Sequence, residues 1–172
     1  MSIISHCTLD TLTKAAASLK AGALVIFPTE TVYGLGADGD NEDAIARIYQ
    51  VKDRPSDHPL IIHIGDINQM RYWISDISDY ALSLARQFWP GSMTLILKRS
   101  ADVKDFITGG QESVGIRIPA HPLALQLLKE FHQLGGHGVA APSANRFGRV
   151  SPTTADAAAQ ELKGYLAPED LI

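Results

Sequence analysis

The feature that most constrains the fold is the alternation of short, mostly apolar runs with longer segments of helical periodicity. The apolar runs are too short for buried helices and are rich in Val, Ile and Leu, which is typical of buried strands. We assign strands to residues 23–27, 60–64, 93–97, 114–118 and 138–141. Strands separated by helices of about a dozen residues predict an α/β fold, a twisted parallel or mixed sheet with flanking helices.

Apolar periodicity and capping residues place helices between these strands. We expect helices over residues 11–20, 41–50, 78–88, 122–133 and 154–163. Asn41 and Ser78 are suited to cap helix N-termini, and Pro122 fits a first helical turn. The last two residues, Leu171 and Ile172, read as the beginning of one more strand.

Length and composition narrow the class of protein. A chain of 172 residues that is 45% apolar and 20% charged is long enough to bury its own core, so we treat residues 1–172 as one domain. The net charge of −4 argues against a strongly basic nucleic-acid binder. A single cysteine, Cys7, excludes an intrachain disulfide framework. We find no apolar stretch of membrane-spanning length and no secretory signal in Met1–Asp10, so we expect a cytoplasmic protein.

Two sequence patterns resemble known binding motifs but do not meet the requirements of those motifs. Gly34, Gly36 and Gly39 match the spacing of a dinucleotide-binding loop, but six residues separate Gly34 from the preceding strand, whereas that loop joins strand directly to helix. His58 and His63 match no usual spacing of metal ligands, and we expect no metal site formed by the protein alone.

Two loops bring unusual polar groups together. In the segment 28–34, alternation places Thr29, Thr31 and Tyr33 on one face of an extended chain, which suits a small polar ligand or a capped turn at a sheet edge. Beyond the helix that starts near Asn41, Lys52 and Arg54 project from one side. Two adjacent cations suit a phosphate between them, or else form a solvated basic pair.

A third loop follows the strand 138–141. Ser143 and Asn145 share a face, and the segment continues through glycine and small hydroxyl residues to Thr154. Small hydroxyls and backbone amides before a helix can cradle a phosphate. The alternative is a helix-capping turn that uses Ser151 or Thr153.

Two strands contain charged or titratable residues. Arg117 lies in an otherwise apolar strand, where it requires an anionic partner, either a carboxylate ligand or an internal Asp or Glu. His63 occupies a similar position in its own strand and reads as a ligand contact or as a core histidine with a satisfied ring.

Five segments in order give the chain a resemblance to a known family. The segments are Phe27–Ala37, Lys52–Ile64, Phe88–Lys98, Val114–Pro119 and Ala140–Thr154. In this order they resemble the YrdC-like domain of threonylcarbamoyl-AMP synthases, with the Lys-x-Arg and Ser-x-Asn motifs intact. The third loop is most similar to that of longer synthases with an extra C-terminal domain. The resemblance implies a catalytic domain without its closing strands or that further domain, folded as a twisted sheet with a concave basic groove.

The resemblance also implies an activity. Such enzymes condense L-threonine, bicarbonate and ATP to threonylcarbamoyl-AMP and pyrophosphate with Mg²⁺, and a transferase complex then modifies tRNA. Matched by motif, Lys52, Arg54, Ser143 and Asn145 are the expected catalytic residues. Expected threonine contacts are Thr31, His63, Arg117 and Ala141. Expected ATP contacts are Arg54, His58, Ser113, Ser143 and Ser151.

Two other readings accompany this one. A non-catalytic module of the same fold would bind RNA weakly through the basic groove, although the cations cluster at loops suited to a small anion. A carbamoyl-transfer domain of the kind found in hydrogenase maturation factors is disfavoured, because those domains belong to much larger, Cys-rich chains.

Overall fold

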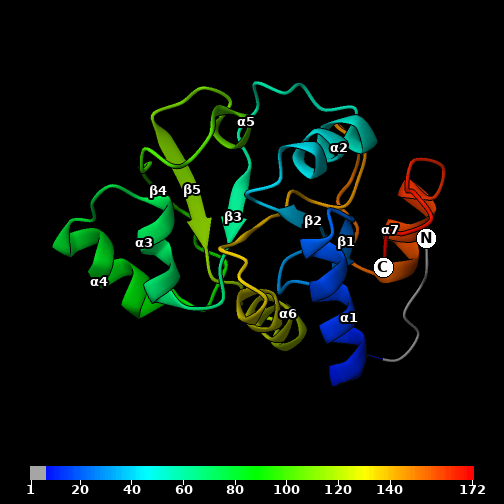
Figure 1. Ribbon diagram of the computed structural model, residues 1–172, viewed down its shortest axis with the longest axis horizontal. Helices are drawn as coiled ribbons and strands as arrows, with labels where there is room; N and C mark the ends of the chain where they lie inside the picture. Colours follow the sequence, from blue (N-terminus) through cyan, green and yellow to red (C-terminus); the bar gives the residue numbers. More distant parts are fainter. Residues whose placement is uncertain (1–6) are drawn as a thin grey trace.

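The computed structural model describes residues 7–172, which form a six-stranded mixed sheet with flanking helices (Figure 1). The strands are β1 (Val25–Phe27), β2 (Gly34–Asp38), β3 (Ile61–His63), β4 (Leu95–Lys98), β5 (Ser113–Arg117) and β6 (Val139–Ala140). Their order is β1-β2-β6-β3-β5-β4, in which β3 and β5 are parallel and the other neighbours antiparallel. The predicted α/β class and mixed sheet are confirmed, while the concave basic groove stays a prediction.

The predicted helices are present, with short additions. They are α1 (Leu9–Lys20), α2 (Glu42–Lys52), α3 (Met70–Trp73), α4 (Asp79–Phe88), α5 (Asp105–Thr108), α6 (Pro122–Gln133) and α7 (Ala155–Leu162), with a 3₁₀ turn at Ile67–Gln69. Asn41 and Ser78 cap α2 and α4 through their side chains, as expected. Thr154 caps α7, so neither Ser151 nor Thr153 serves as that cap.

The sequence analysis did not predict β2, because its two glycines are not typical of a strand. A Cβ atom on Gly36 would lie 2.8 Å from the Phe27 ring and 2.9 Å from a methyl group of Val139. Glycine therefore permits β1, β2 and β6 to pack closely. Since Gly34 begins a strand, the glycine spacing does not form a dinucleotide-binding turn.

The core lies on both faces of the sheet, as the apolar runs require. Successive residues of β1 alternate: Val25 and Phe27 pack with α1 and α6, whereas Ile26 belongs to the larger cluster with α2 and β5. Figure 1 shows α1 and α6 side by side, with α3 and α4 at the opposite end of the molecule from α7. Burial on both faces explains why β1 lacks polar alternation, whereas the exposed Ile61 and Ile96 show that β3 and β4 are partly open to solvent on one face.

The C-terminal segment is fastened to β1 and α2. Leu171 forms a parallel bridge with Val25, and the backbone amide of Ile26 donates to its carbonyl at 2.8 Å. The buried carboxylate of Asp170 accepts hydrogen bonds from Arg47 at 2.6 Å and from the backbone amide of Leu24 at 2.8 Å. The predicted strand-like character of the last residues is therefore confirmed for Leu171.

No helix among residues 7–172 is long and apolar enough to span a membrane. The expectation that Met1–Asp10 lacks a secretory signal rests partly on residues 1–6, which lie outside the described residues.

We expect Asp170→Asn to lower the free energy of unfolding by about 2–3 kcal/mol, because it removes the charge that compensates Arg47 and leaves buried amides with a weaker acceptor. Chemical denaturation would measure the loss. Glu169→Gln is the matched control, since its side chain is 61% exposed and 4.0 Å from Arg47. Equal stability of the two variants would contradict this role of Asp170.

Candidate functional site

The parallel pairing of β3 with β5 places two predicted threonine contacts side by side. His63 and Arg117 are register partners at the ends of these strands. The loop between β1 and β2 adds Thr31, whose hydroxyl accepts a hydrogen bond from Nη2 of Arg117 at 3.2 Å. Thr29 and Thr31 lie with their hydroxyls 3.0 Å apart, as the alternation predicted. The sequence-distant groups Thr31, His63 and Arg117 therefore form one cluster.

Arg117 has an internal counter-ion, which is one of the two kinds of partner that the sequence left open. Its Nη2 donates to Oε1 of Glu30 at 2.6 Å, and its Nε donates to the carbonyl of Gly91 at 3.1 Å. Oε2 of Glu30 accepts from the backbone amide of Ala120 at 3.0 Å. Desolvation opposes ionisation of Glu30, but these hydrogen bonds and the charge of Arg117 together lower its pKa below the ordinary value.

His63 is a neutral, buried imidazole. Only 3% of the residue is exposed, and burial, followed by the charge of Arg117, lowers its pKa to about 4. Its Nδ1 is buried without a hydrogen-bond partner. This nitrogen lacks the protein partner that a core histidine with a satisfied ring would have.

Lys52 is buried rather than solvated. It is 2% exposed, and its ammonium group donates to the carbonyls of Ser143 and Asn145, both at 2.6 Å. Desolvation, followed by the charge of Arg54, lowers the pKa of Lys52 to about 8 against the opposing effect of Glu161. The Lys-x-Arg and Ser-x-Asn motifs thus meet in space, with Lys52 holding the loop that carries Ser143 and Asn145.

A left-handed residue separates Lys52 from Arg54. Asp53 has φ = 53°, an uncommon conformation for a side-chain-bearing residue, and its carboxylate accepts from Arg146 at 2.8 Å. Nη2 of Arg54 donates to the carbonyl of Pro59 at 3.0 Å, while its Nε is buried without a partner. A solvated basic pair is therefore excluded, because each cation has a defined environment.

An aromatic residue that sequence analysis did not single out joins this region. Phe147 packs against His58 with ring centroids 5.4 Å apart, and the guanidinium of Arg54 lies 6.0 Å from the same ring. Phe147 is 47% exposed. Its backbone amide donates to the carbonyl of Lys52 at 2.7 Å. The one sequence signal that could have identified Phe147 is its position within the third loop.

Hydrogen bonds within the third loop, made by the side chain of Asn145, stabilise its conformation. Nδ2 of Asn145 donates to the carbonyls of Arg146 and Arg149 at 2.8 and 2.9 Å, whereas its Oδ1 is buried without a partner. Ser143 forms a bridge with Gly34 at the start of β2.

The remaining predicted contacts lie at strand ends or loops. Ala141 is buried and donates its amide to the carbonyl of Ile61 at 3.1 Å. Ser113 begins β5, and Ser151 is partly buried before α7.

The loop between β1 and β2 connects the two groups of residues. At one end Thr31 contacts Arg117. At the other end the carbonyl of Tyr33 accepts from Ala144 at 2.8 Å, and its amide donates to the carbonyl of Pro152 at 2.9 Å. The predicted threonine contacts and the predicted nucleotide loop are therefore tied to one segment of chain.

Unpartnered buried polar atoms concentrate on the predicted site. Among the side chains of residues 7–172, the buried nitrogen or oxygen atoms without a hydrogen-bond partner are Nε of Arg54, Nδ1 of His63 and Oδ1 of Asn145. All belong to residues selected from the sequence. Because buried polar groups in native proteins are nearly always paired, these unpaired atoms distinguish the predicted site from the rest of the described interior.

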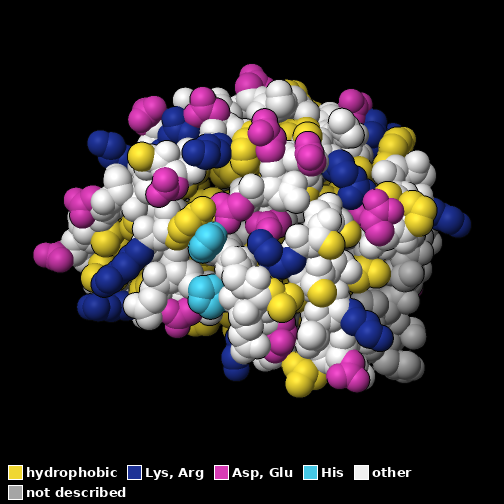
Figure 2. Space-filling view, viewed as in Figure 1, with side chains coloured by type: hydrophobic (Ala, Val, Ile, Leu, Met, Phe, Trp, Pro, Cys, Tyr) yellow, Lys and Arg dark blue, Asp and Glu magenta, His cyan; other side chains and the backbone are white. Residues whose placement is uncertain are grey.

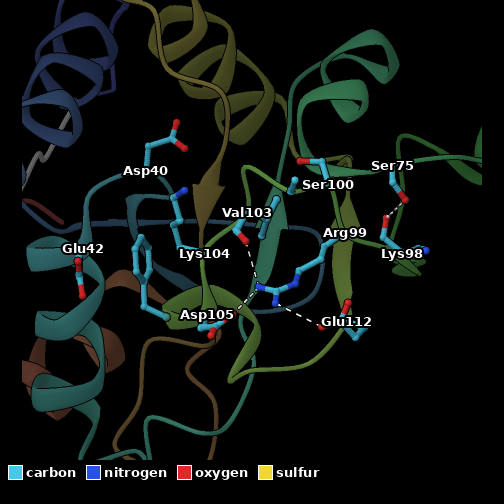
Figure 3. A pocket seen from close by; sticks show the side chains of 12 residues that line it. Asp40, Glu42, Ser75, Lys98, Arg99, Ser100, Val103, Lys104, Asp105 and Glu112 are labelled. Carbon is cyan, nitrogen blue, oxygen red and sulfur yellow. Dashed lines mark hydrogen bonds and ion pairs between the residues drawn. The ribbon is translucent and has the colours of Figure 1, made fainter.

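A cavity of about 930 Å³ lies elsewhere in the molecule, and its lining contains none of these residues. Figure 3 shows Arg99 in its wall, paired with Asp105 at 2.6 Å and with Glu112 at 3.5 Å. The charged groups around Arg99 neutralise one another within the protein. We therefore place the candidate site at the unpartnered atoms rather than in this cavity.

The fold and these polar groups define an α/β domain whose candidate site has the chemistry to suit a small polar ligand. A sequence model of the family described as Sua5/YciO/YrdC, telomere recombination, matches residues 17–167. The chain belongs to this family.

Curated relatives agree with the family assignment. Threonylcarbamoyl-AMP synthase of Bacillus subtilis is 48% identical over 157 residues, which cover 91% of this chain and 44% of that protein. The synthase of Vibrio vulnificus is 35% identical over 161 residues, which cover 92% of this chain and 84% of that protein. The chain thus spans less than half of the Bacillus relative and most of the Vibrio relative.

Comparison with solved structures supports the same family assignment. Sua5 of Pyrococcus abyssi, complexed with L-threonine, matches with a TM-score of 0.92 at 41% identity, over 100% of this chain and 50% of that protein. YciO of E. coli matches with a TM-score of 0.82 at 20% identity, which supports the fold alone.

We expect Lys52→Met to loosen the loop that carries Ser143 and Asn145, because the two carbonyls lose their shared donor. Hydrogen exchange measured by mass spectrometry should rise in peptides covering residues 143–149. Arg54→Met is the control, since Arg54 donates to Pro59 instead. Unchanged exchange in Lys52→Met would contradict the clamp.

We expect His63 to make the fold sensitive to acid. The unfolded chain takes up a proton on this residue near pH 6.5, whereas the folded chain resists it until about pH 4. Stability attributable to His63 is therefore lost as the pH falls through that window. In denaturation at a series of pH values, His63→Gln should lose less stability between pH 6.5 and 4 than the parent. The prediction is refuted if the free energy of unfolding falls equally with pH in His63→Gln and in the parent. The control is His132→Gln, a substitution at an exposed position.

Proposed function

We propose that this chain is the catalytic domain of an L-threonylcarbamoyladenylate synthase, a nucleotidyltransferase. The observation that supports it most strongly is the set of unpartnered buried atoms on Arg54, His63 and Asn145, which distributes ligand-ready groups over both the predicted threonine and nucleotide contacts. The named relatives and the likeness to Sua5 complexed with L-threonine support the same assignment.

The cluster on β3 and β5 suits L-threonine. Arg117 offers a cation for the substrate carboxylate, and Nη1 has no protein partner among its hydrogen bonds. The hydroxyl of Thr31 and the neutral ring of His63 suit the hydroxyl group of the substrate. Ala141 would contribute backbone groups beside them.

The second cluster suits ATP. Arg54 would bind phosphate oxygens, with Ser143 and Ser151 as further donors and with His58 and Ser113 nearby in the fold's expected nucleotide groove. Lys52 would act on this cluster in two ways, through its positive charge and by fixing the loop that bears Ser143 and Asn145.

The reaction requires three substrates in one place. The ammonium group of threonine first loses a proton, which balances the proton consumed when bicarbonate yields CO₂ and water. The resulting neutral amine adds to the carbon of CO₂ and loses a second proton, which gives a carbamate. A carbamate oxygen then attacks the α-phosphorus of ATP, the bond to the bridging oxygen of the β-phosphate breaks, and pyrophosphate leaves. Positioning and neutralisation of negative charge by Arg54 and Lys52 would supply most of the rate enhancement.

We further propose that Mg²⁺ enters with ATP. The described residues contain no group of three or more His, Cys, Asp or Glu side chains arranged to hold a metal ion. A hard cation carried mainly by phosphate oxygens would neutralise charge on the triphosphate. The product would pass to a transferase complex acting on tRNA, in the cytoplasm.

The alternative is an RNA-binding module without catalysis. Figure 2 shows basic and acidic side chains interspersed over the visible face, rather than the continuous basic surface that RNA binding favours. The cations of the site are also held individually, Lys52 by carbonyls and Arg117 by Glu30. A small-molecule site is therefore the better reading.

We expect Arg54→Ala to lower threonine-dependent pyrophosphate release by at least about tenfold, because a charged phosphate contact is lost. The assay contains ATP, bicarbonate, Mg²⁺ and L-threonine. Arg71→Ala, at an exposed position on α3, is the control and should retain the parent rate. Salt-sensitive RNA retention without turnover in the parent chain would support the alternative and reject the proposal.

A further inference from the structure

We propose that Glu30 determines substrate specificity by binding the ammonium group of the incoming amino acid. The inference rests on the proposed function and extends it to a residue that sequence analysis did not select. Thr31, His63 and Arg117 suit the hydroxyl and carboxylate of threonine, but they leave its ammonium group without a counter-ion. Glu30 lies beside Arg117 and supplies one.

The carboxylate of Glu30 is held in place while remaining able to accept more hydrogen bonds. Oε1 accepts from Arg117 at 2.6 Å and Oε2 from the amide of Ala120 at 3.0 Å. A carboxylate can accept about four hydrogen bonds, so the contacts with Arg117, Ala120 and the backbone of Glu30 itself leave capacity for a ligand. Its side chain is 24% exposed, which leaves it open to a ligand.

The charges of the cluster match those of a free amino acid. The pKa of Glu30 is lowered, so the residue is ionised at neutral pH beside the positive charge of Arg117. Burial keeps His63 neutral there. The Arg117–Glu30 pair therefore presents one positive and one negative group, which a zwitterion can match end to end. A ligand with a carboxylate alone would instead meet the negative charge of Glu30.

A purely structural role for Glu30 makes a different prediction. If Glu30 only holds Arg117 in position, its loss would weaken every ligand that uses Arg117, whether or not that ligand carries an ammonium group. If Glu30 binds the ammonium group, its loss would weaken only ligands that have one.

The test compares two ligands that differ in that group. L-Threonine and (R)-3-hydroxybutyrate share the carboxylate and the hydroxyl, but the second lacks the ammonium group. Isothermal titration calorimetry on the parent chain, Glu30→Gln and Glu30→Asp would give the ratio of the two dissociation constants. We expect the preference for threonine to fall about tenfold or more in Glu30→Gln, in keeping with the loss of one charged hydrogen bond. We expect Glu30→Asp, which keeps the charge, to retain a preference for threonine.

Controls separate this inference from the proposed function. Glu112→Gln removes another carboxylate that pairs with an arginine, at the opposite end of β5, and should leave the preference unchanged. Equal weakening of both ligands in Glu30→Gln would overturn the inference and leave the proposed function standing. Failure of the parent chain to bind L-threonine would overturn both. Since Glu30→Asp preserves the charge, loss of its preference together with a retained fold would also count against ammonium binding.

Discussion

The parallel pairing of β3 with β5 is the constraint on which the site depends. It places His63 beside Arg117 and so joins a neutral imidazole to a cation at one end of the sheet. The register partners Ile62 and Ile116, on the two strands, are both fully buried in the larger core cluster and stabilise this pairing. Arg117 can remain in such a strand only because Glu30 neutralises it from a loop far away in sequence.

Lys52 links a second pair of distant segments in a comparable way. The end of α2 delivers its ammonium group to the carbonyls of Ser143 and Asn145. Burying a charged group is costly unless it is hydrogen-bonded, and the two carbonyls compensate it only in part, as the lowered pKa of Lys52 indicates. A negatively charged ligand bound near Lys52 would offset this unfavourable desolvation of its ammonium group.

Much of the fold could be predicted, and the reasons are physical. Strands such as 60–64 and 114–118 are apolar runs apart from His63 and Arg117, and the helix caps Asn41 and Ser78 have side chains suited to that position. The strand β2 escaped prediction because Gly36 is required by close packing against Phe27, a contact that no local pattern reveals. The site residues came from their positions in loops and from family resemblance. The partner of Arg117 and the burial of Lys52 could not be predicted, since both depend on contacts made across the fold.

Those contacts have a consequence for how the chain acquires its site. Arg117 and Glu30 are 87 positions apart, and Lys52 and Ser143 are 91 positions apart. Closing such long loops costs entropy before any contact compensates it, so neither half of the site can form from a local fragment. During synthesis on the ribosome, the loop at Ser143 would meet Lys52 only after most of the sheet has emerged. Ligand binding would then report completion of the fold, because a partly folded chain lacks the geometry that binding requires.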